Sequence, residues 1–217
     1  MLKVTSDILL NMDNKKVTML VLLDLSAAFD TVDHDILLHV LSDNFGVKDN
    51  VKSWFHSYLR PRTQSVMVEE SIAGKQVLNQ GVPQGSCAGP VLYTAYASTL
   101  SQTISKHLPE VMGYADDHAL YLAFQAGDDT LEHDAVSAME DCLQDVKLWM
   151  NLNRLKMNNA KSEFIIFGTR MQLTKLGVTH ITIGSCNTNC QDNVKYLGVY
   201  LDDNLSMQSS LLQFIQH

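Results

Sequence analysis

Two adjacent aspartates, Asp116 and Asp117, interrupt an apolar stretch and constrain the fold of this chain more than any other feature. Residues 111–112 precede the pair, and the aliphatic and aromatic run 119–124 follows it. Apolar runs with a short polar interruption predict two strands joined by a tight turn. A structural turn accounts for one aspartate. Two neighbouring carboxylates repel each other unless a cation lies between them, so the pair also suggests a metal site.

A third carboxylate, Asp24, ends a strongly apolar segment. Residues 17–23 read VTMLVLL, which is typical of a strand covered on both faces. A carboxylate at the end of a buried strand is costly unless it is solvated, paired or bound to a metal. Asp24 therefore either reaches solvent or caps a turn, or it binds a metal ion.

A glycine-rich loop, GVPQGS at residues 81–86, precedes a predicted helix. Glycine allows positive φ angles and a close approach of the backbone to a partner. Ser86 is the expected N-cap of a helix from Cys87 to about Ile104, with Pro90 in its first turn. Such a loop at a helix N-terminus can face a phosphate or a base, although loops of this composition are common.

The remaining pattern alternates helices with strands. We expect helices over residues 2–12, 33–46, 51–59 and 130–152, and strands over residues 162–167, 181–183 and 194–201. Asp49 is the expected cap of the helix over residues 51–59, whose aromatic residues Trp54 and Phe55 we interpret as core. A hairpin of residues 63–69 and 75–79 is expected to turn around Gly74.

Charge is distributed unevenly along a chain whose net charge is −8. Residues 116–146 hold nine acidic side chains and no Lys or Arg, whereas residues 51–68 hold three basic and no acidic ones. Residues 147–175 hold six basic side chains against Glu163 alone. Ordinary solvated faces explain such blocks. The alternative is an acidic site flanked by cationic grooves, which would suit a phosphate-rich ligand held around metal ions.

The cysteines and apolar runs bear on compartment. Cys186 and Cys190, together with His180, could supply three zinc ligands, but no fourth stands at finger-like spacing, so we favour unpaired thiols in a reducing compartment. The apolar patch at residues 8–10 is flanked by acidic residues, unlike a signal peptide. The apolar run 17–23 is too short to span a bilayer. We expect a soluble, intracellular protein without a membrane partner, in either nucleus or cytoplasm.

Five segments, taken in order, resemble motifs A to E of the reverse transcriptases of non-LTR (LINE-type) retrotransposons. They are LLDLSAAFDTVDH at residues 22–34, GVPQGS at 81–86 with Gly89 and Pro90, YADD at 114–117, LKMN at 155–158 through Lys161 to residues 167–168, and YLGV at 196–199. Residues 58–66 also resemble the segment that precedes motif B. The matches cover nearly the whole chain, and the set is far more specific than any one motif.

The resemblance implies an α+β fold, a polymerase palm whose antiparallel sheet carries the catalytic aspartates and is backed by helices, with partial fingers. We expect residues 1–217 to be a partial reverse transcriptase domain. Its palm core would span about residues 17–168, and its terminal hairpin about residues 180–201. The match begins just before motif A and ends soon after motif E, so most of the fingers, the thumb and any endonuclease are expected to lie outside these residues.

The same resemblance implies an RNA-directed DNA polymerase that works by a two-metal mechanism. Two Mg²⁺ ions, with Mn²⁺ as a substitute, would lie about 3.5 to 4 Å apart. Mg²⁺ prefers hard oxygen ligands. Asp24 and Asp116 would bridge the ions, with Asp117 as an auxiliary ligand and the carbonyl of Leu25 completing a site. Lys161 would lie near the triphosphate or the leaving pyrophosphate and is the fourth expected catalytic residue.

Substrate-binding residues follow from the same motifs. Phe29, five residues after Asp24, stands where a bulky ring would exclude a 2′-hydroxyl by overlap, although it could also be an ordinary core residue. Gln84 and Gly85 would contact the incoming nucleotide or the template, and Arg62 a phosphate or the template. The implied partners are an RNA template, a DNA primer and deoxynucleoside triphosphates.

Some residues depart from the family pattern. His118 stands where these enzymes usually carry Thr, and Cys87 is unusual after the glycine-rich loop. The alternative function is a catalytically inert remnant of a retroelement that retains weak nucleic-acid binding. A two-metal phosphohydrolase is a third, more distant hypothesis.

Overall fold

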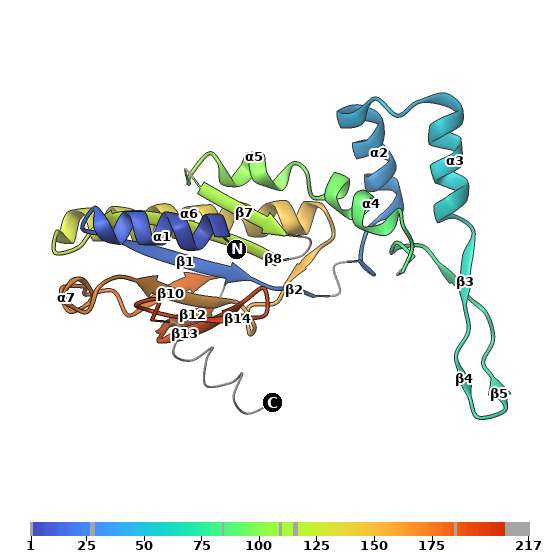
Figure 1. Cartoon of the computed structure of the whole chain (residues 1–217). Helices are drawn as coiled ribbons and strands as arrows, with labels where there is room; N and C mark the ends of the chain where they lie inside the picture. The colour runs from blue at the N-terminus through green and yellow to red at the C-terminus, as the bar shows by residue number, and fades with distance from the viewer. Residues whose placement is uncertain are drawn as a thin grey trace. The chain divides into compact units, whose positions relative to one another are not determined.

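The computed structural model describes residues 2–26, 29–83, 85–108, 110–114, 117–184 and 186–206 (Figure 1). These residues form two compact units, each made of segments that are distant in sequence. The first, here called the sheet unit, comprises the described residues within the ranges 1–25, 100–149 and 157–217. The second, the helical unit, comprises the described residues within 26–99 and 150–156.

A six-stranded sheet forms the centre of the sheet unit. Its strands, in the order in which they lie side by side, are β11 (His180–Ile183), β12 (Cys186–Gln191), β10 (Glu163–Phe167), β1 (Lys16–Leu23), β8 (Asp117–Gln125) and β7 (Glu110–Tyr114). Only β10 and β12 pair in parallel, whereas the other neighbours are antiparallel. The predicted strands around residues 17–23, 119–124 and 162–167 are confirmed.

Strand β1 lies in the middle of this sheet because it is apolar on both faces. Leu20 packs in a core with Val4 and Ile8 of α1 (Leu2–Asp13), the helix that lies along β1 in Figure 1. Met19 and Val21, which alternate with Leu20 along the strand, are also fully buried. Burial of both faces explains why the segment reads as an uninterrupted apolar run.

Helix α6 (Asp129–Leu152) is the longest helix among the described residues. Side chains at three- and four-residue spacing along it are buried, among them Ala135, Met139, Cys142 and Val146. The prediction of a helix over residues 130–152 is confirmed. The short helices of the sheet unit are α5 (Leu100–Ile104) and α7 (Arg170–Leu173).

The C-terminal strands differ from their prediction. Residues 194–201 are two strands, β13 (Asn193–Tyr196) and β14 (Val199–Asp202), because Leu197 and Gly198 adopt positive φ angles of 48° and 84° and reverse the chain. Strand β12 has the sequence CNTNCQ and was not predicted, since it is polar and has no fully buried residue. Pairing with β11 and β10 holds this segment in the sheet, although its side chains contribute little to a core.

The helical unit contains α2 (His34–Phe45), α3 (Asp49–Leu59) and α4 (Gly89–Tyr96). Asp33, where this helix was predicted to begin, is the N-cap of α2, and the helix ends before Gly46, which has the left-handed φ of 66°. The predicted capping role of Asp49 is wrong, because Lys48 is the N-cap of α3 and Asp49 is already helical. Strands β2 (Leu25–Ser26) and β9 (Lys156–Met157) lie where the chain passes between the units.

Two further expectations for the helical unit are corrected. The predicted helix over residues 87–104 ends at Tyr96, and its cap position is Ala88 rather than Ser86, whose hydroxyl oxygen instead accepts a bond from the Gly89 N–H at 3.0 Å. The predicted hairpin turns at residues 69–70 rather than at Gly74. Its strands are β3 (Arg62–Gln64), β4 (Met67–Val68), β5 (Ser71–Ile72) and β6 (Gln76–Leu78).

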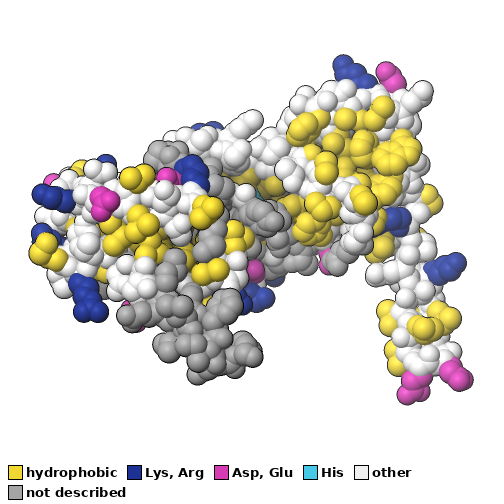
Figure 2. All heavy atoms as spheres, viewed as in Figure 1, with side chains coloured by type: hydrophobic (Ala, Val, Ile, Leu, Met, Phe, Trp, Pro, Cys, Tyr) yellow, Lys and Arg dark blue, Asp and Glu magenta, His cyan; other side chains and the backbone are white. Residues whose placement is uncertain are grey.

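The aromatic residues of α3 do not all enter a core. Trp54 keeps 55% of its surface exposed, which overturns the interpretation of this residue as core. Its ring stacks on Tyr58, with 5.4 Å between the centroids. Figure 2 shows the resulting apolar surface over α2 and α3, to which Phe45 and Val51 also contribute. Within the described residues, no helix is both long and apolar enough to cross a membrane.

Candidate active site

Asp24 and Asp117 come to the same edge of the central sheet. Asp24 directly follows β1, and Asp117 is the first residue of β8. The last pair in the register of these antiparallel strands is Leu23 with His118. Asp24 and Asp117 are therefore the next positions on two neighbouring strands. Asp116 and the side chain of Asp117 lie outside the described part of the chain.

The carboxylate of Asp24 is half-buried and has one neutral hydrogen-bond donor. Its Oδ2 accepts a bond from the side-chain amide of Asn158 at 2.9 Å, and its main-chain carbonyl accepts the Asn158 N–H, also at 2.9 Å. Asp24 takes part in none of the ion pairs found among the described residues. Within the described residues, the second carboxylate oxygen therefore has no partner that would keep a ligand from it.

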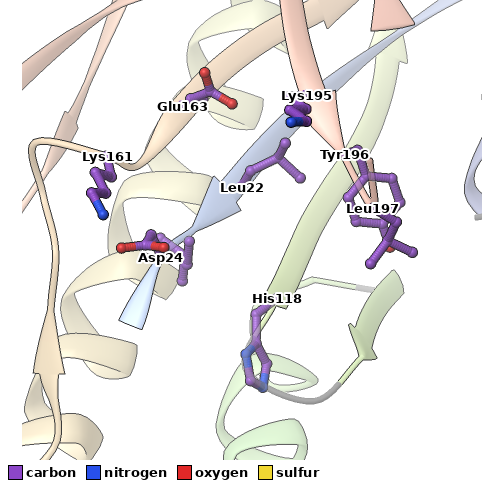
Figure 3. Close-up of a pocket in the computed structure, with 9 residues that line it drawn as sticks. Leu22, Asp24, His118, Lys161, Glu163, Lys195, Tyr196 and Leu197 are labelled. Carbon is purple, nitrogen blue, oxygen red and sulfur yellow. The ribbon is translucent and has the colours of Figure 1, made fainter. Parts of the chain in front are cut away.

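A cavity of about 100 Å³ opens beside Asp24. Its walls come from four separate segments, and the lining residues are Leu22, Leu23, Asp24, His118, Lys161, Glu163, Lys195, Tyr196 and Leu197. Figure 3 shows the side chain of Lys161 extending toward Asp24 from the loop before β10. The cavity thus joins segments that resemble motifs A, D and E with His118, the residue after the segment that resembles motif C, and it has two lysines and two carboxylates on its walls.

Glu163 was not predicted as a site residue. Burial raises the pKa of its carboxyl above the ordinary value, and a bond from the main chain of Lys195 opposes part of that rise. Glu163 pairs with Leu22 across β10 and β1, which explains its place on the cavity wall. It lies within the segment that resembles motif D, but it received no role there, since its place on the cavity wall follows from strand register.

His118 fills the space beside a glycine. The imidazole is buried, and a Cβ added at Gly113, its partner on β7, would meet ring atoms of His118 at 3.4 and 3.5 Å. A Cβ on Gly113 would therefore touch the ring in ordinary van der Waals contact. His118 was noted in the sequence only as a departure from the family pattern.

In the helical unit, the glycine-rich loop is fixed at its first residue. The Gly81 N–H donates to the carbonyl of Val32 at 2.8 Å, and its own carbonyl accepts from His34 Nε2 at 2.8 Å and Arg62 Nη2 at 2.9 Å. A Cβ at Gly81 would lie 2.9 Å from the carbonyl oxygen of Asp30. This close backbone approach, together with a φ of 86°, requires glycine.

His34 is held as a neutral imidazole by its partners. Nε2 donates to the Gly81 carbonyl, so Nδ1 must accept the bond that Arg60 Nε donates at 3.2 Å. Burial lowers the pKa of His34, and the charges of Arg60 and Arg62 lower it further. The Gly81 carbonyl and Asp33 oppose that shift. His34 was not predicted as a functional residue.

Phe29 is half-buried in the helical unit. Its ring packs against Tyr93, with 4.8 Å between the centroids, and its carbonyl accepts the Val82 N–H at 2.9 Å. Gly85 has a φ of 76° and no atom within 4 Å of an added Cβ, so the turn rather than close packing calls for glycine. Gln84 lies outside the described residues.

A known protein family matches nearly the whole chain. The family model described as reverse transcriptase (RNA-dependent DNA polymerase) matches residues 2–201. The chain belongs to this family. The match spans the segments that resemble motifs A to E and confirms the resemblance on which the site was predicted.

Reverse transcriptases of fly transposons are among the related proteins. "Probable RNA-directed DNA polymerase from transposon BS" of Drosophila melanogaster is 28% identical over 94% of this chain, and the match covers 22% of that protein. "RNA-directed DNA polymerase from mobile element jockey" of the same fly is 26% identical, with the same two coverages. The chain therefore spans about a fifth of the length of these relatives.

Solved telomerase structures share the fold. Telomerase from Candida tropicalis in complex with the TWJ fragment of telomeric RNA matches with a TM-score of 0.61 and 13% identity, over 95% of this chain and 32% of that one. Apo telomerase from C. tropicalis truncated from its C-terminal domain matches with a TM-score of 0.57 and 15% identity, over 87% and 38%. At such identities the likeness concerns the fold alone, and it confirms the predicted α+β polymerase palm.

Eight of the nine predicted site residues of this reverse transcriptase chain fall into three groups. Asp24 and Lys161 line one cavity of the sheet unit. Phe29, Arg62 and Gly85 belong to the helical unit, where Arg62 bonds to the glycine-rich loop itself. The third group, which is Asp116 and Gln84 with the side chain of Asp117, lies outside the residues that the structure describes. Leu25 is buried on β2 at the end of the sheet unit.

The weaker zinc hypothesis finds no support. His180 lies opposite Asn189, and Cys186 lies opposite Ile183, on the antiparallel strands β11 and β12. The cysteines are free thiols. Among the described residues, no three His, Cys, Asp or Glu side chains gather into a metal-holding group.

Proposed function

We propose that this chain is the palm and part of the fingers of an RNA-directed DNA polymerase from a non-LTR retroelement. It would take an RNA template, a DNA primer and deoxynucleoside triphosphates. One observation carries the proposal: the register of β1 and β8 sets Asp24 and Asp117 at adjacent positions, and Lys161 lines the cavity beside Asp24. The fly relatives, named as RNA-directed DNA polymerases, support the same reaction.

The donor set suits a hard divalent cation. Asp24 offers a carboxylate oxygen that no Lys or Arg among the described residues pairs with, and it lies on a cavity wall. Carboxylate and carbonyl oxygens are ligands that Mg²⁺ and Mn²⁺ accept, whereas zinc sites favour nitrogen and sulfur. Asp24, Asp116 and Asp117, with the Leu25 carbonyl, would hold two such ions. When bound, the ions stabilise negative charge on the attacking 3′-oxygen and the leaving pyrophosphate.

The chain's own residues supply positioning and charge. The Lys161 ammonium would donate hydrogen bonds to phosphate oxygens and offset the charge that develops on pyrophosphate. Phe29, supported from behind by Tyr93, would exclude a 2′-hydroxyl by overlap. Gln84 and Gly85 would contact the nucleotide or the template. Arg62 would keep the glycine-rich loop in place through Gly81 while its remaining N–H groups reach a phosphate.

The domain assignment is part of this proposal. Residues 1–217 would be a partial reverse transcriptase domain, with a palm core over about residues 17–168 and a terminal hairpin over about residues 180–201. The central sheet and its pairing of β1, β8 and β10 support this core. The hairpin of β13 and β14 contributes Lys195 and Tyr196 to the cavity, which gives the terminal strands a role in the site.

Primer extension on an RNA template tests the function. Wild-type protein with Mg²⁺ should incorporate deoxynucleotides, and Asp24→Asn or Asp116→Asn should each lower the rate by about 1000-fold, which corresponds to about 4 kcal/mol. Asp13→Asn, at the C-terminal end of α1, is the matched control and should extend normally. Unimpaired extension by either active-site variant would contradict the proposal.

Charge favours a second candidate, an inert chain with weak nucleic-acid binding. The net charge of −8 opposes association with a polyanion, and nine acidic residues lie between positions 116 and 146. A protein with few phosphate contacts binds nucleic acid with a shallow salt dependence. Binding at low salt only, together with no extension under any metal condition, would favour this candidate over the polymerase.

A further inference from the structure

Asn158 bonds both to Asp24 and to the loop that carries Lys161, two residues that line the cavity. It lies at the start of the loop between β9 and β10, in the segment that resembles motif D. Its side-chain amide and its main-chain N–H both donate to Asp24, one to the carboxylate and one to the carbonyl. A single residue thereby fixes both the backbone and the side chain of Asp24.

The other end of Asn158 organises the loop that carries Lys161. Its carbonyl accepts bonds from the Lys161 N–H at 3.1 Å, the Ser162 N–H at 3.0 Å and the Ser162 hydroxyl at 3.1 Å. Ser162 is buried, so this turn is anchored at the start of β10. Asn158 therefore links the position of the carboxylate to the position of the lysine.

An amide is well suited to this task. It is neutral, so it fixes one oxygen of Asp24 without neutralising the carboxylate as a Lys or Arg would. It bonds to Oδ2, and within the described residues Oδ1 has no hydrogen-bond partner that would compete with a cation. Hydrogen-bond donors behind a metal ligand fix its orientation, and their loss typically costs about 10- to 100-fold in metal affinity or activity.

We propose that Asn158 is a positioning residue that holds the Asp24 carboxylate in the orientation needed to bind a divalent cation. This inference rests on the proposed two-metal function. It assigns to Asn158 a role beyond forming a turn, because a turn requires only the main-chain bonds. The side-chain bond to Asp24 is the part that the proposal explains.

Mn²⁺ binding measured by electron paramagnetic resonance tests the inference without relying on polymerase activity. Asn158→Leu keeps the shape and the main-chain N–H but removes the amide donor, and Asn158→Ala is a second variant with the same backbone bonds. Each should weaken Mn²⁺ binding by about 10- to 100-fold. Asn159→Ala changes a neighbouring half-buried amide whose side chain lies near Gly184, and it should bind Mn²⁺ as the wild type does.

The outcomes separate the inference from the function on which it rests. If Asp24→Asn abolishes Mn²⁺ binding but both Asn158 variants bind as the wild type does, the metal site stands and the role of Asn158 is overturned. If the wild-type protein binds no Mn²⁺ that depends on Asp24, the two-metal function fails and the inference fails with it. Melting curves without metal identify a merely structural role, which would lower the melting temperature and leave the Mn²⁺ affinity of the folded protein unchanged.

Discussion

Two aspartates from the same thirteen-residue motif, Asp24 and Asp33, are treated in opposite ways by the fold. In the helical unit, Asp33 Oδ1 accepts the N–H groups of Asp35 and Ile36, and Oδ2 forms an ion pair with Arg154. Only 9% of the Asp33 side chain is exposed. Both of its oxygens are used within the protein, so this carboxylate stabilises the start of α2.

Asp24, in the sheet unit, has one oxygen bonded to a neutral amide, and the residue lines a cavity. The basic residues show the same contrast. Arg60 bonds to both Asp35 and His34, whereas Lys161 extends toward Asp24 without an ion pair among the described residues. A polar group whose bonding capacity is used internally serves the fold, whereas one left partly unused beside a cavity is available to a ligand.

The largest expected effect is stabilisation of the folded protein by a divalent metal, which should depend on Asp24 and not on Asp33. A ligand that binds only the folded state stabilises it, by about 2.7 kcal/mol at a concentration 100 times its Kd. Mg²⁺ or Mn²⁺ should therefore raise the melting temperature of the wild type, and Asp24→Asn should abolish that gain. Asp33→Asn should retain it. A wild-type melting curve that ignores millimolar metal would show that Asp24 is not part of a preformed site.

Phe29 tests whether the helical unit also offers a ligand surface. Phe29→Val removes the ring that Tyr93 supports and should admit ribonucleotides. A steric change of this size in a binding pocket is worth about 10- to 100-fold in discrimination. Steady-state extension with ribo- and deoxynucleotides measures the ratio in an active protein. Equal loss on both substrates would show that Phe29 only packs within the helical unit and does not select the sugar.

The sequence predicted the elements that have a strong local pattern better than the elements that depend on distant partners. The apolar run of β1 and the helical spacing of α6 carry their structure in local patterns, so both were predicted nearly to the residue. Strand β12 has polar residues and depends on its neighbours for pairing, so no local signal marked it. The break at Leu197 was missed because a non-glycine residue there adopts a positive φ.

The site residues also divide into those that a sequence motif identified and those that only tertiary contacts bring to the cavity. Asp24 and Lys161 were found through motifs whose residue types suit the chemistry. Glu163 and Lys195 were missed because they reach the cavity through strand register and hairpin packing, which no short motif records. Asn158 stood inside a recognised motif but received no role, since its bond to Asp24 joins residues 134 positions apart.

The third effect concerns the capping role of Asp33. Asp33→Ala removes the acceptor for two N–H groups at the start of α2, which should cost about 1 to 2 kcal/mol in the free energy of unfolding. Arg154 is largely exposed and can be solvated, so its loss of a partner should add little. Urea unfolding measures the difference. Asp43→Ala, at an exposed position on the same helix, is the control, and a similar loss there would argue against a specific cap.

The smallest expected effect is a pH dependence that originates at His34. Its pKa in the folded protein is lowered from 6.5, chiefly by burial, while the unfolded chain retains the ordinary value. Below about pH 6.5 the unfolded state therefore binds more protons than the folded state, and stability falls as the pH falls toward the lowered folded pKa. The loss is about 1.4 kcal/mol for each unit by which the pKa is lowered. It should be absent above pH 7.5, where both states are neutral.

His34→Gln can keep a donor to the Gly81 carbonyl and cannot titrate, so it should flatten this part of the stability curve. Protonation of His34 would place a proton on Nδ1, where Arg60 already donates, so the charged form disrupts the network that fixes the glycine-rich loop. Urea unfolding between pH 5 and pH 8 measures the slope. His39→Gln, at an exposed position on α2, is the matched control and should leave the slope unchanged. An identical slope in wild type and His34→Gln would show that this buried histidine does not govern the acid sensitivity of the helical unit.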